Sequence, residues 1–118
     1  LEGNFIDQWH LHHPMSVTEG KNGDKNLYIG EMGPPDVQEG VKGLGNRIVI
    51  LTPDGKKVGD FGRGLPGQDD DQFVAPHGVT TDSKGNVYVG EVAWTFWGSK
   101  QDPQPLGELI SLRKWEKQ

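Results

Sequence analysis

Cysteine is absent from the sequence, and so are long apolar runs. Without cysteine the chain forms no disulfide and offers no thiolate ligand to a metal ion. No stretch approaches the roughly 18 consecutive apolar residues that would cross a bilayer, so we expect no membrane partner. The net charge of −5 is unlike the basic excess of a general nucleic-acid-binding protein, so we expect no nucleic-acid partner. Long runs of helix-forming residues are also missing, and we predict no helix.

Glycine, by contrast, is abundant, with 18 glycines among 118 residues. Apolar residues make up 32% of the chain, and this composition is typical of one small domain with many turns. The opening "LEGNFIDQW" has no initiator methionine and no basic segment followed by an apolar one. We therefore expect a processed or partial chain that carries no signal peptide.

An internal repeat dominates the sequence. The stretch "HPMSVTEGKNGDKNLYIGEM" (13–32) returns as "APHGVTTDSKGNVYVGEV" (75–92), with two extra residues in the turn of the first copy. In each copy apolar residues alternate around a tyrosine, Tyr28 or Tyr88, which is the period of a β-strand. Each copy therefore predicts a short strand, a Gly/Asn/Asp turn and a second strand that ends in Gly-Glu.

Further strands flank the two copies. "NRIVILTPDGKKVGDF" (46–61) reads as a hairpin, because Asp-Gly between apolar alternations is a strong turn signal. "GNFIDQW" (3–9) is similar to "GKKVGDFG" (55–62), and "GELISLRKWEK" (107–117) alternates again. The predicted strands lie at about 3–9, 15–20, 26–32, 47–52, 56–62, 78–82, 86–92 and 107–115.

This strand order predicts an all-β fold made of antiparallel meanders. A unit of about 60 residues with four strands has the size of a propeller blade. The chain, 1–118, then forms a single β-propeller fragment. Its parts are the outer strand of a preceding blade (3–9), a full blade (14–62) and a three-stranded blade (76–116).

Two of these stretches carry a family resemblance. "QFVAPHGVTTDSKGNVYVGEV" (72–92) resembles the NHL-repeat pattern of aromatic, Pro, Gly-hydrophobic, Asp, Gly-Asn and a strand ending in Gly plus an acid. "GNRIVILTPDGKKVGDFG" (45–62) resembles the second half of that repeat. The resemblance covers nearly all of the chain. It implies a six-bladed β-propeller, of which this chain is similar to the C-terminal portion.

Two blades do not close a ring, and an isolated pair would leave two apolar faces in water. We therefore expect the remaining blades to come either from a longer chain or from identical subunits. Three copies would form a six-bladed ring with cyclic symmetry, so the predicted partner is a further part of the same protein or a second copy of it.

The connections of a meander alternate between the two ends of the sheet, so their lengths can be sorted by end. The turns within hairpins are short, whereas "GPPDVQEGVKGLG" (33–45), "GRGLPGQDDDQFVAP" (62–76) and "AWTFWGSKQDPQPLG" (93–107) are long and fall on one rim. Long loops held together by a rigid frame are where binding sites concentrate. The candidate ligand-binding residues there are Arg47, Arg63, Trp94 and Trp97. The alternative is that these loops only cover the end of the ring or seal a subunit contact.

Three residues near the expected central channel could carry metal or acid–base chemistry. The peptidyl-hydroxyglycine lyase of peptide amidation, on this fold, is a zinc enzyme whose His ligands include one in a Pro-His step. Pro76-His77 resembles that step, while the other copy has Met15 there. We predict His77 and Glu91 as catalytic candidates and His77, Glu31 and Glu91 as ligands of Zn or Ca. The alternative roles are structural hydrogen bonds within the blades.

Two further groups are weaker metal candidates. His10, His12 and His13 are dense enough to bind Zn or Cu, or they are surface and packing residues. The run Asp69–Asp71 could hold Ca²⁺ but lacks the ligand spacing of a calcium loop, which favours a solvated loop.

The sequence thus predicts an NHL-type binding scaffold that recognises a ligand, peptide or protein through long loops on one face. The competing function is a metal-dependent lyase or hydrolase at the mouth of the central channel. A third is a purely structural piece of a larger enzyme.

Overall fold

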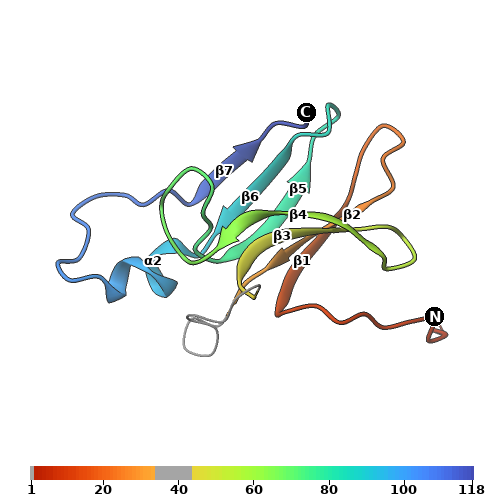
Figure 1. The fold of residues 1–118 in the computed structure, drawn as a ribbon, viewed down its shortest axis with the longest axis horizontal. Helices are drawn as coiled ribbons and strands as arrows, with labels where there is room; N and C mark the ends of the chain where they lie inside the picture. The colour runs from red at the N-terminus through yellow and green to blue at the C-terminus, as the bar shows by residue number, and fades with distance from the viewer. Residues whose placement is uncertain (1, 34–43) are drawn as a thin grey trace.

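The computed structural model describes residues 2–33 and 44–118, which form two antiparallel sheets (Figure 1). The first, sheet A, has the order β1-β2-β3-β4, and the second, sheet B, has the order β5-β6-β7. The strands are β1 (Pro14–Glu19), β2 (Leu27–Glu31), β3 (Asn46–Leu51), β4 (Lys57–Gly64), β5 (Pro76–Thr81), β6 (Val87–Glu91) and β7 (Leu112–Trp115). The all-β prediction is therefore confirmed, and seven of the eight predicted strands, all but 3–9, are present in the predicted order. No helix in the described residues is long and apolar enough to cross a membrane.

The prediction that the chain has no helix was wrong for the connection from β6 to β7. The connection from β6 to β7 contains a helical turn, α2 (Ala93–Phe96), followed by a 3₁₀ turn, η1 (Gly98–Lys100). Coiling the chain here turns Ala93, Phe96 and Trp97 toward one apolar cluster at the end of the sheets. A segment of this length is too short to show a helical period in its sequence.

Two predicted strands differ in the structure. β7 begins only at Leu112, although the alternation of apolar and polar residues starts earlier. The reason is that the Gln68 side chain hydrogen-bonds the backbone N–H and C=O of Ile110. Its amide nitrogen donates to Ile110 O at 3.3 Å, and its oxygen accepts from Ile110 N at 2.8 Å. Residues 3–9 have no regular secondary structure. No described strand of this chain pairs with them, so their role as an outer strand stays a prediction.

The two copies of the repeat adopt the same strand register. In β1 and β2, Pro14 lies opposite Glu31 and Thr18 opposite Tyr28. In β5 and β6, Pro76 lies opposite Glu91 and Thr80 opposite Tyr88, with the register shift at the same place. The next strand continues the equivalence, because Ile48 of β3 pairs with Gly30 as Leu112 of β7 pairs with Gly90. Each residue of sheet B therefore has a counterpart in sheet A.

The main core lies between the two sheets. Its fully or largely buried members are Tyr28, Ile48, Phe73, Val87 and Val89. At its edge three aromatic rings cluster, with the Phe61 and Trp115 centroids 4.9 Å apart and the Phe73 and Trp115 centroids 5.6 Å apart. Aromatic rings at these separations stabilise a core beyond their area of burial.

The sheets stack with different faces in contact. Sheet A contributes the face that carries Tyr28 and Ile48. Sheet B contributes the face that carries Val87 and Val89, which is the face opposite to that of Tyr88, the equivalent of Tyr28. The sheet A residues at the positions of that second face form a separate cluster on the outside of sheet A: Ile29, Val49, Leu51 and the partly buried Leu27. The two sheets therefore stack through non-equivalent faces.

Gly30 makes this stacking possible. A Cβ at Gly30 would lie 3.0 Å from the Pro76 carbonyl oxygen and 3.1 Å from Val79 Cγ2. Both contacts are tighter than an ordinary van der Waals contact of about 3.5–4.0 Å. A hydrogen bond from the Thr81 hydroxyl to Glu19 O, 3.0 Å long, joins the first strands of the two sheets.

Candidate functional site

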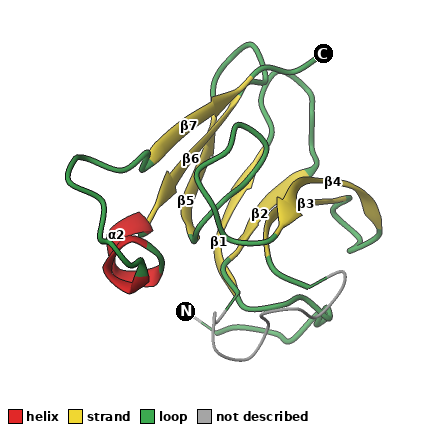
Figure 2. Cartoon of the chain, turned by 60° about the vertical axis from the view of Figure 1, so that its left-hand side comes forward, coloured by secondary structure: helices red, strands yellow, loops and turns green. Residues whose placement is uncertain are grey.

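The long connections gather at one end of the sheets, as their alternation predicted. Asn22 Nδ2 donates to Ser83 O, which holds the short β1–β2 and β5–β6 turns together at the other end. At the long-connection rim, Met32 after β2, Val74 and Ala75 before β5, and Ala93 after β6 form one buried cluster. Figure 2 shows helix α2 at the opposite end of sheet B from the C-terminus. Of the predicted loop 33–45, residues 34–43 lie outside the described residues.

Glu31, one of the predicted metal ligands, is buried at this rim in an ion pair. Its carboxylate accepts from Arg47 Nε at 2.6 Å and from the backbone N–H of His12 at 2.8 Å. Only 1% of the Glu31 side chain is exposed, against 19% of the Arg47 side chain. Arg47 Nη1 also approaches Asp60 at 3.5 Å. The pair thus fastens β2 to β3 and to the segment that enters β1.

Glu91 makes the equivalent contacts in sheet B, and its burial is complete. It accepts from Arg113 Nε at 2.8 Å and from the backbone N–H groups of Val74 and Ala75. The exposed fractions of the two side chains are 0% and 8%. Arg113 Nη1 donates to Asp69 O at 3.1 Å, while its Nη2 is buried without a partner in the described part of the chain.

The two arginines come from different registers. Arg47 lies opposite Glu31 in the pairing of β2 with β3, whereas Arg113 lies opposite Val89, nearer the middle of β6. The sequence analysis did not identify Arg113 as a partner of Glu91. The usable signal was a lone arginine on the face of β7 that alternation turns toward the core. Both glutamates hold backbone and arginine donors, the structural role that was the alternative.

The structure does not bring the predicted metal ligands into one group. His77 is exposed on β5, and Glu31 and Glu91 are each engaged by their own arginine. Nowhere in 2–33 and 44–118 do three His, Asp or Glu side chains lie close enough to hold a metal ion. The donor set that the lyase resemblance implies for Zn, and the set proposed for Ca, therefore do not fit these residues.

The backbone groups of His12 and His13, rather than their imidazoles, tie the N-terminal segment to the end of β2. His12 N donates to Glu31, and the carbonyl oxygen of His13 accepts from Met32 N at 3.1 Å. His12 Nε2 is buried and has no partner among the described atoms. His10 lines a groove of about 320 Å³ on the outer face of sheet A, together with Trp9, Glu31, Arg47 and Lys57. The groove places the predicted ligand-binding residue Arg47 beside the side chains of Trp9, His10 and Lys57.

The run Asp69–Asp71, for which the sequence favoured a solvated loop over a Ca²⁺ site, forms an exposed loop that is closed by Arg63. Arg63 Nη2 donates to Asp69 at 2.7 Å, and Arg63 Nε donates to Asp71 at 2.6 Å. These hydrogen bonds, with that of Asp69 the strongest influence, raise the pKa of Arg63 above its ordinary value. Arg63 was predicted to bind an anionic ligand, and in the structure it already has two carboxylate partners.

Of the aromatic rim residues, Phe96 and Trp97 are partly buried and Trp94 is exposed. Phe96 and Trp97 pack against the cluster of Met32 and Ala93. Trp94 is 49% exposed, and its ring lies over Gly98, where an added Cβ would meet Trp94 Cε3 at 2.9 Å. Trp94 is therefore held in place by the chain and still offers an aromatic surface to solvent.

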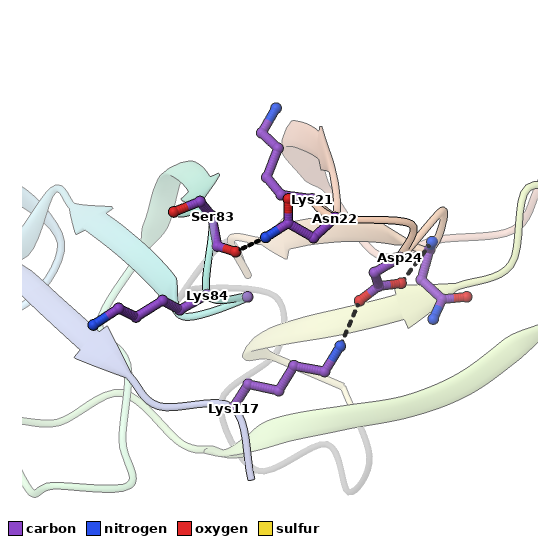
Figure 3. A pocket seen from close by; sticks show the side chains of 8 residues that line it. Lys21, Asn22, Asp24, Ser83, Lys84 and Lys117 are labelled. Atoms are coloured by element: carbon purple, nitrogen blue, oxygen red, sulfur yellow. Dashed lines mark hydrogen bonds and ion pairs between the residues drawn. The ribbon is translucent and has the colours of Figure 1, made fainter.

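The opposite, short-turn rim has a pocket of about 460 Å³ that the sequence analysis did not identify. It is lined by three lysines, Lys21, Lys84 and Lys117, with Asn22, Asp24, Asn26, Ser83 and Gly85. Figure 3 shows Lys21 and Lys84 extending in different directions and Lys117 reaching Asp24, 3.1 Å away. The ammonium groups do not converge, so the pocket does not concentrate charge on one point.

Asp24 joins the β1–β2 turn to Tyr28 and to Lys117, near the C-terminus, at this rim. It accepts from Asn26 N at 3.0 Å, from the Tyr28 hydroxyl at 2.8 Å and from Lys117. Burial, the largest single influence, raises the pKa of Asp24, but the three hydrogen bonds together hold it below its ordinary value. Burial and the Asp24 carboxylate raise the pKa of Tyr28 to about 12.

Asp82 has the equivalent place in sheet B, where it accepts hydrogen bonds from Asn86 and, at 3.2 Å, from the Tyr88 hydroxyl.

Comparison with protein-family models found no match, and no solved structure matched the chain significantly.

Proposed function

We propose that this chain forms two successive blades of an NHL-type, six-bladed β-propeller and that it is a binding scaffold. Its recognition surface is the rim of long connections, and its ligand is a peptide or an exposed segment of a protein. The observation that carries the proposal is the sorting of connections. Short turns meet at the Asn22–Ser83 contact, and the long segments meet around Met32, Val74 and Ala93.

The equivalence of the sheets supports the propeller part of this proposal. Blades of a propeller repeat one meander and stack through non-equivalent faces around an axis. Sheets A and B share their strand register and stack through non-equivalent faces. Their first strands are joined by the Thr81–Glu19 bond, as expected for neighbouring strands near a common axis.

The anchoring of the segments that enter sheets A and B supports the binding part. Fully buried ion pairs at Glu91 and nearly buried ones at Glu31 anchor the segments entering each sheet. Beside them Trp94 presents half of its surface to solvent. Aromatic anchors on rigid supports carry much of the binding energy in peptide and protein interfaces.

Selection from a displayed random-peptide library tests this function directly. Peptides selected on the wild-type chain should bind Trp94→Ala at least about tenfold more weakly, the loss typical of an interface hot spot. Lys84→Ala, on the short-turn rim, is the matched control and should bind normally. Binding would be measured by isothermal titration calorimetry.

Two results would count against the proposal. Selected peptides that bind Trp94→Ala as tightly as the wild type would remove the long-connection rim from the site. Peptides sensitive to Lys84→Ala but not to Trp94→Ala would move the site to the pocket of Figure 3.

A further inference from the structure

One face of sheet B is uncovered although its counterpart in sheet A is buried. Ile48 in sheet A is 0% exposed, whereas Leu112 at the equivalent position in sheet B is 70% exposed. Tyr28 is buried beneath sheet B, and Tyr88 is only half-buried. Apolar side chains at core positions of the repeat therefore face solvent on this side of sheet B.

Gly90 lies in the middle of that uncovered face, and nothing in the described part of the chain requires a glycine there. A Cβ at Gly90 would meet only Gly78 O, at 3.9 Å, and its φ is not in the left-handed region. Its counterpart Gly30 is packed against the Pro76 carbonyl and Val79. Glycine inside a strand often marks a close approach by another backbone, so Gly90 has the space for such a partner.

A complementary face of sheet A is uncovered along β1, although Ile29 in β2 is only 3% exposed because it packs in a cluster with Val49 and Leu11. The counterparts of Val79 and Val89, which cover Tyr28 and Gly30, are Val17 and Ile29. Val17 is 63% exposed. It borders an apolar groove of about 330 Å³ whose other lining residues are Trp9, Leu11, Pro14, Met15, Ser16 and Ile29. The chain thus exposes one half of this internally formed interface on sheet B and the β1 part of the other half on sheet A.

We propose that the uncovered face of sheet B, centred on Gly90, Tyr88 and Leu112, is a docking surface for sheet A of a second copy of this chain. The incoming copy repeats the internal contact, so that its Pro14 and Val17 approach Gly90 as Pro76 and Val79 approach Gly30. The docking rests on the proposed reading of the sheets as successive blades. It is independent of any ligand at the long-connection rim.

The same placement gives residues 3–9 a partner. In the chain, β4 pairs with β3 before the chain crosses to sheet B. The equivalent segment of an incoming copy is 3–9, and it would lie along the free edge of β7. Because the two docking faces differ, the contact is heterologous and generates a closed ring or a linear chain of copies.

The first experiment compares two glycine-to-valine variants by light scattering after size-exclusion chromatography. The wild type should have a mass above the 13.0 kDa of one chain. Gly90→Val should shift to one chain mass, with association weakened at least tenfold, because its side chain fills the space left for Pro14 and Val17. Gly107→Val is the matched control, since Gly107 also has open space around it, and it should assemble as the wild type does.

The second experiment uses the asymmetry of the contact. Val17→Lys puts a charge on the donor face, where Val17 is already exposed in the single chain, and should also give one chain mass. Mixed with Gly90→Val, it should form a one-to-one dimer that grows no further. Each partner supplies the face that the other has lost. Circular dichroism of each variant checks that the sheets are intact.

A wild type that stays at one chain mass at its highest soluble concentration would overturn the proposal. So would a Gly90→Val variant that is folded and assembles normally, or a mixture of the two variants that stays monomeric. If a variant fails to fold, cross-linking of the wild type between cysteines introduced at Val17 and Leu112 decides the matter. Peptide binding at Trp94 is measured separately, so failure of the docking and failure of the rim function are distinguishable.

Discussion

Sheets A and B start from the same sequence pattern and the same register but end in different environments. Tyr28 and Tyr88 each bond an aspartate at the short-turn rim, and Glu31 and Glu91 each hold an arginine at the other. Sheet A has a fourth strand and a covered Tyr28 face, whereas sheet B among the described residues has three strands and an open Tyr88 face.

This comparison separates what the repeat itself requires from what stacking requires. The glutamate is needed in both sheets, because in each it binds backbone N–H groups of the segment that enters the first strand. The glycine is needed by packing only in sheet A, where the second sheet covers it. We therefore expect equivalent residues of the two sheets to contribute unequally to the free energy of unfolding, because their surroundings differ.

The largest difference is expected between the two glutamates. Glu91→Ala leaves the buried Arg113 guanidinium and two backbone N–H groups without their acceptor, at a cost of about 3–5 kcal/mol. Glu31→Ala should cost about 1–3 kcal/mol, because Arg47 is partly exposed and retains Asp60. Urea unfolding measures both, and the exposed Glu116→Ala, expected within about 0.5 kcal/mol of the wild type, is the control. Equal losses for Glu31 and Glu91 would show that burial does not set their contribution.

The two glycines are expected to differ in sign. Gly30→Ala places a methyl group 3.0 Å from a carbonyl oxygen of the other sheet, and overpacking of this kind costs about 1–3 kcal/mol. Gly90→Ala meets no close atom and should be neutral or stabilise by about 0.4–1 kcal/mol, because alanine restricts the unfolded chain. Thermal unfolding at concentrations where the mass is that of one chain measures both. A destabilised Gly90→Ala under those conditions would mean that the chain itself needs this glycine.

The repeat made much of this fold predictable from sequence. Alternation around Tyr28 and Tyr88 located β2 and β6 to within a residue, and the parity of a meander sorted the connections by end. Contacts that break the repeat were out of reach. Arg113 binds Glu91 from a strand position whose counterpart in sheet A is not an arginine. Gln68, in a distant loop, binds the backbone of Ile110 just before the start of β7. Helix α2 forms because its apolar residues meet a cluster drawn from three other segments.

The smallest effect concerns the Tyr28 hydroxyl and depends on pH. The pKa of Tyr28 is raised from 10.0 to about 12 in the folded chain, so between these values the unfolded chain has lost a proton that the folded chain keeps. Stability from this group is fully present below pH 10 and is lost as pH rises toward 12. Tyr28→Phe should cost about 1 kcal/mol at neutral pH and should remove this part of the alkaline loss.

Urea unfolding across that alkaline range measures the effect as the difference between wild type and Tyr28→Phe in how steeply the free energy of unfolding falls with pH. Tyr88→Phe is the matched control in sheet B. It removes the hydrogen bond to Asp82 but leaves Tyr28 and Asp24 in place, so its stability should retain the Tyr28 contribution to the alkaline slope. If Tyr28→Phe loses stability with pH as steeply as the wild type, the covered face of sheet A does not hold its tyrosine protonated. The contrast between the two tyrosines would then lie in packing alone.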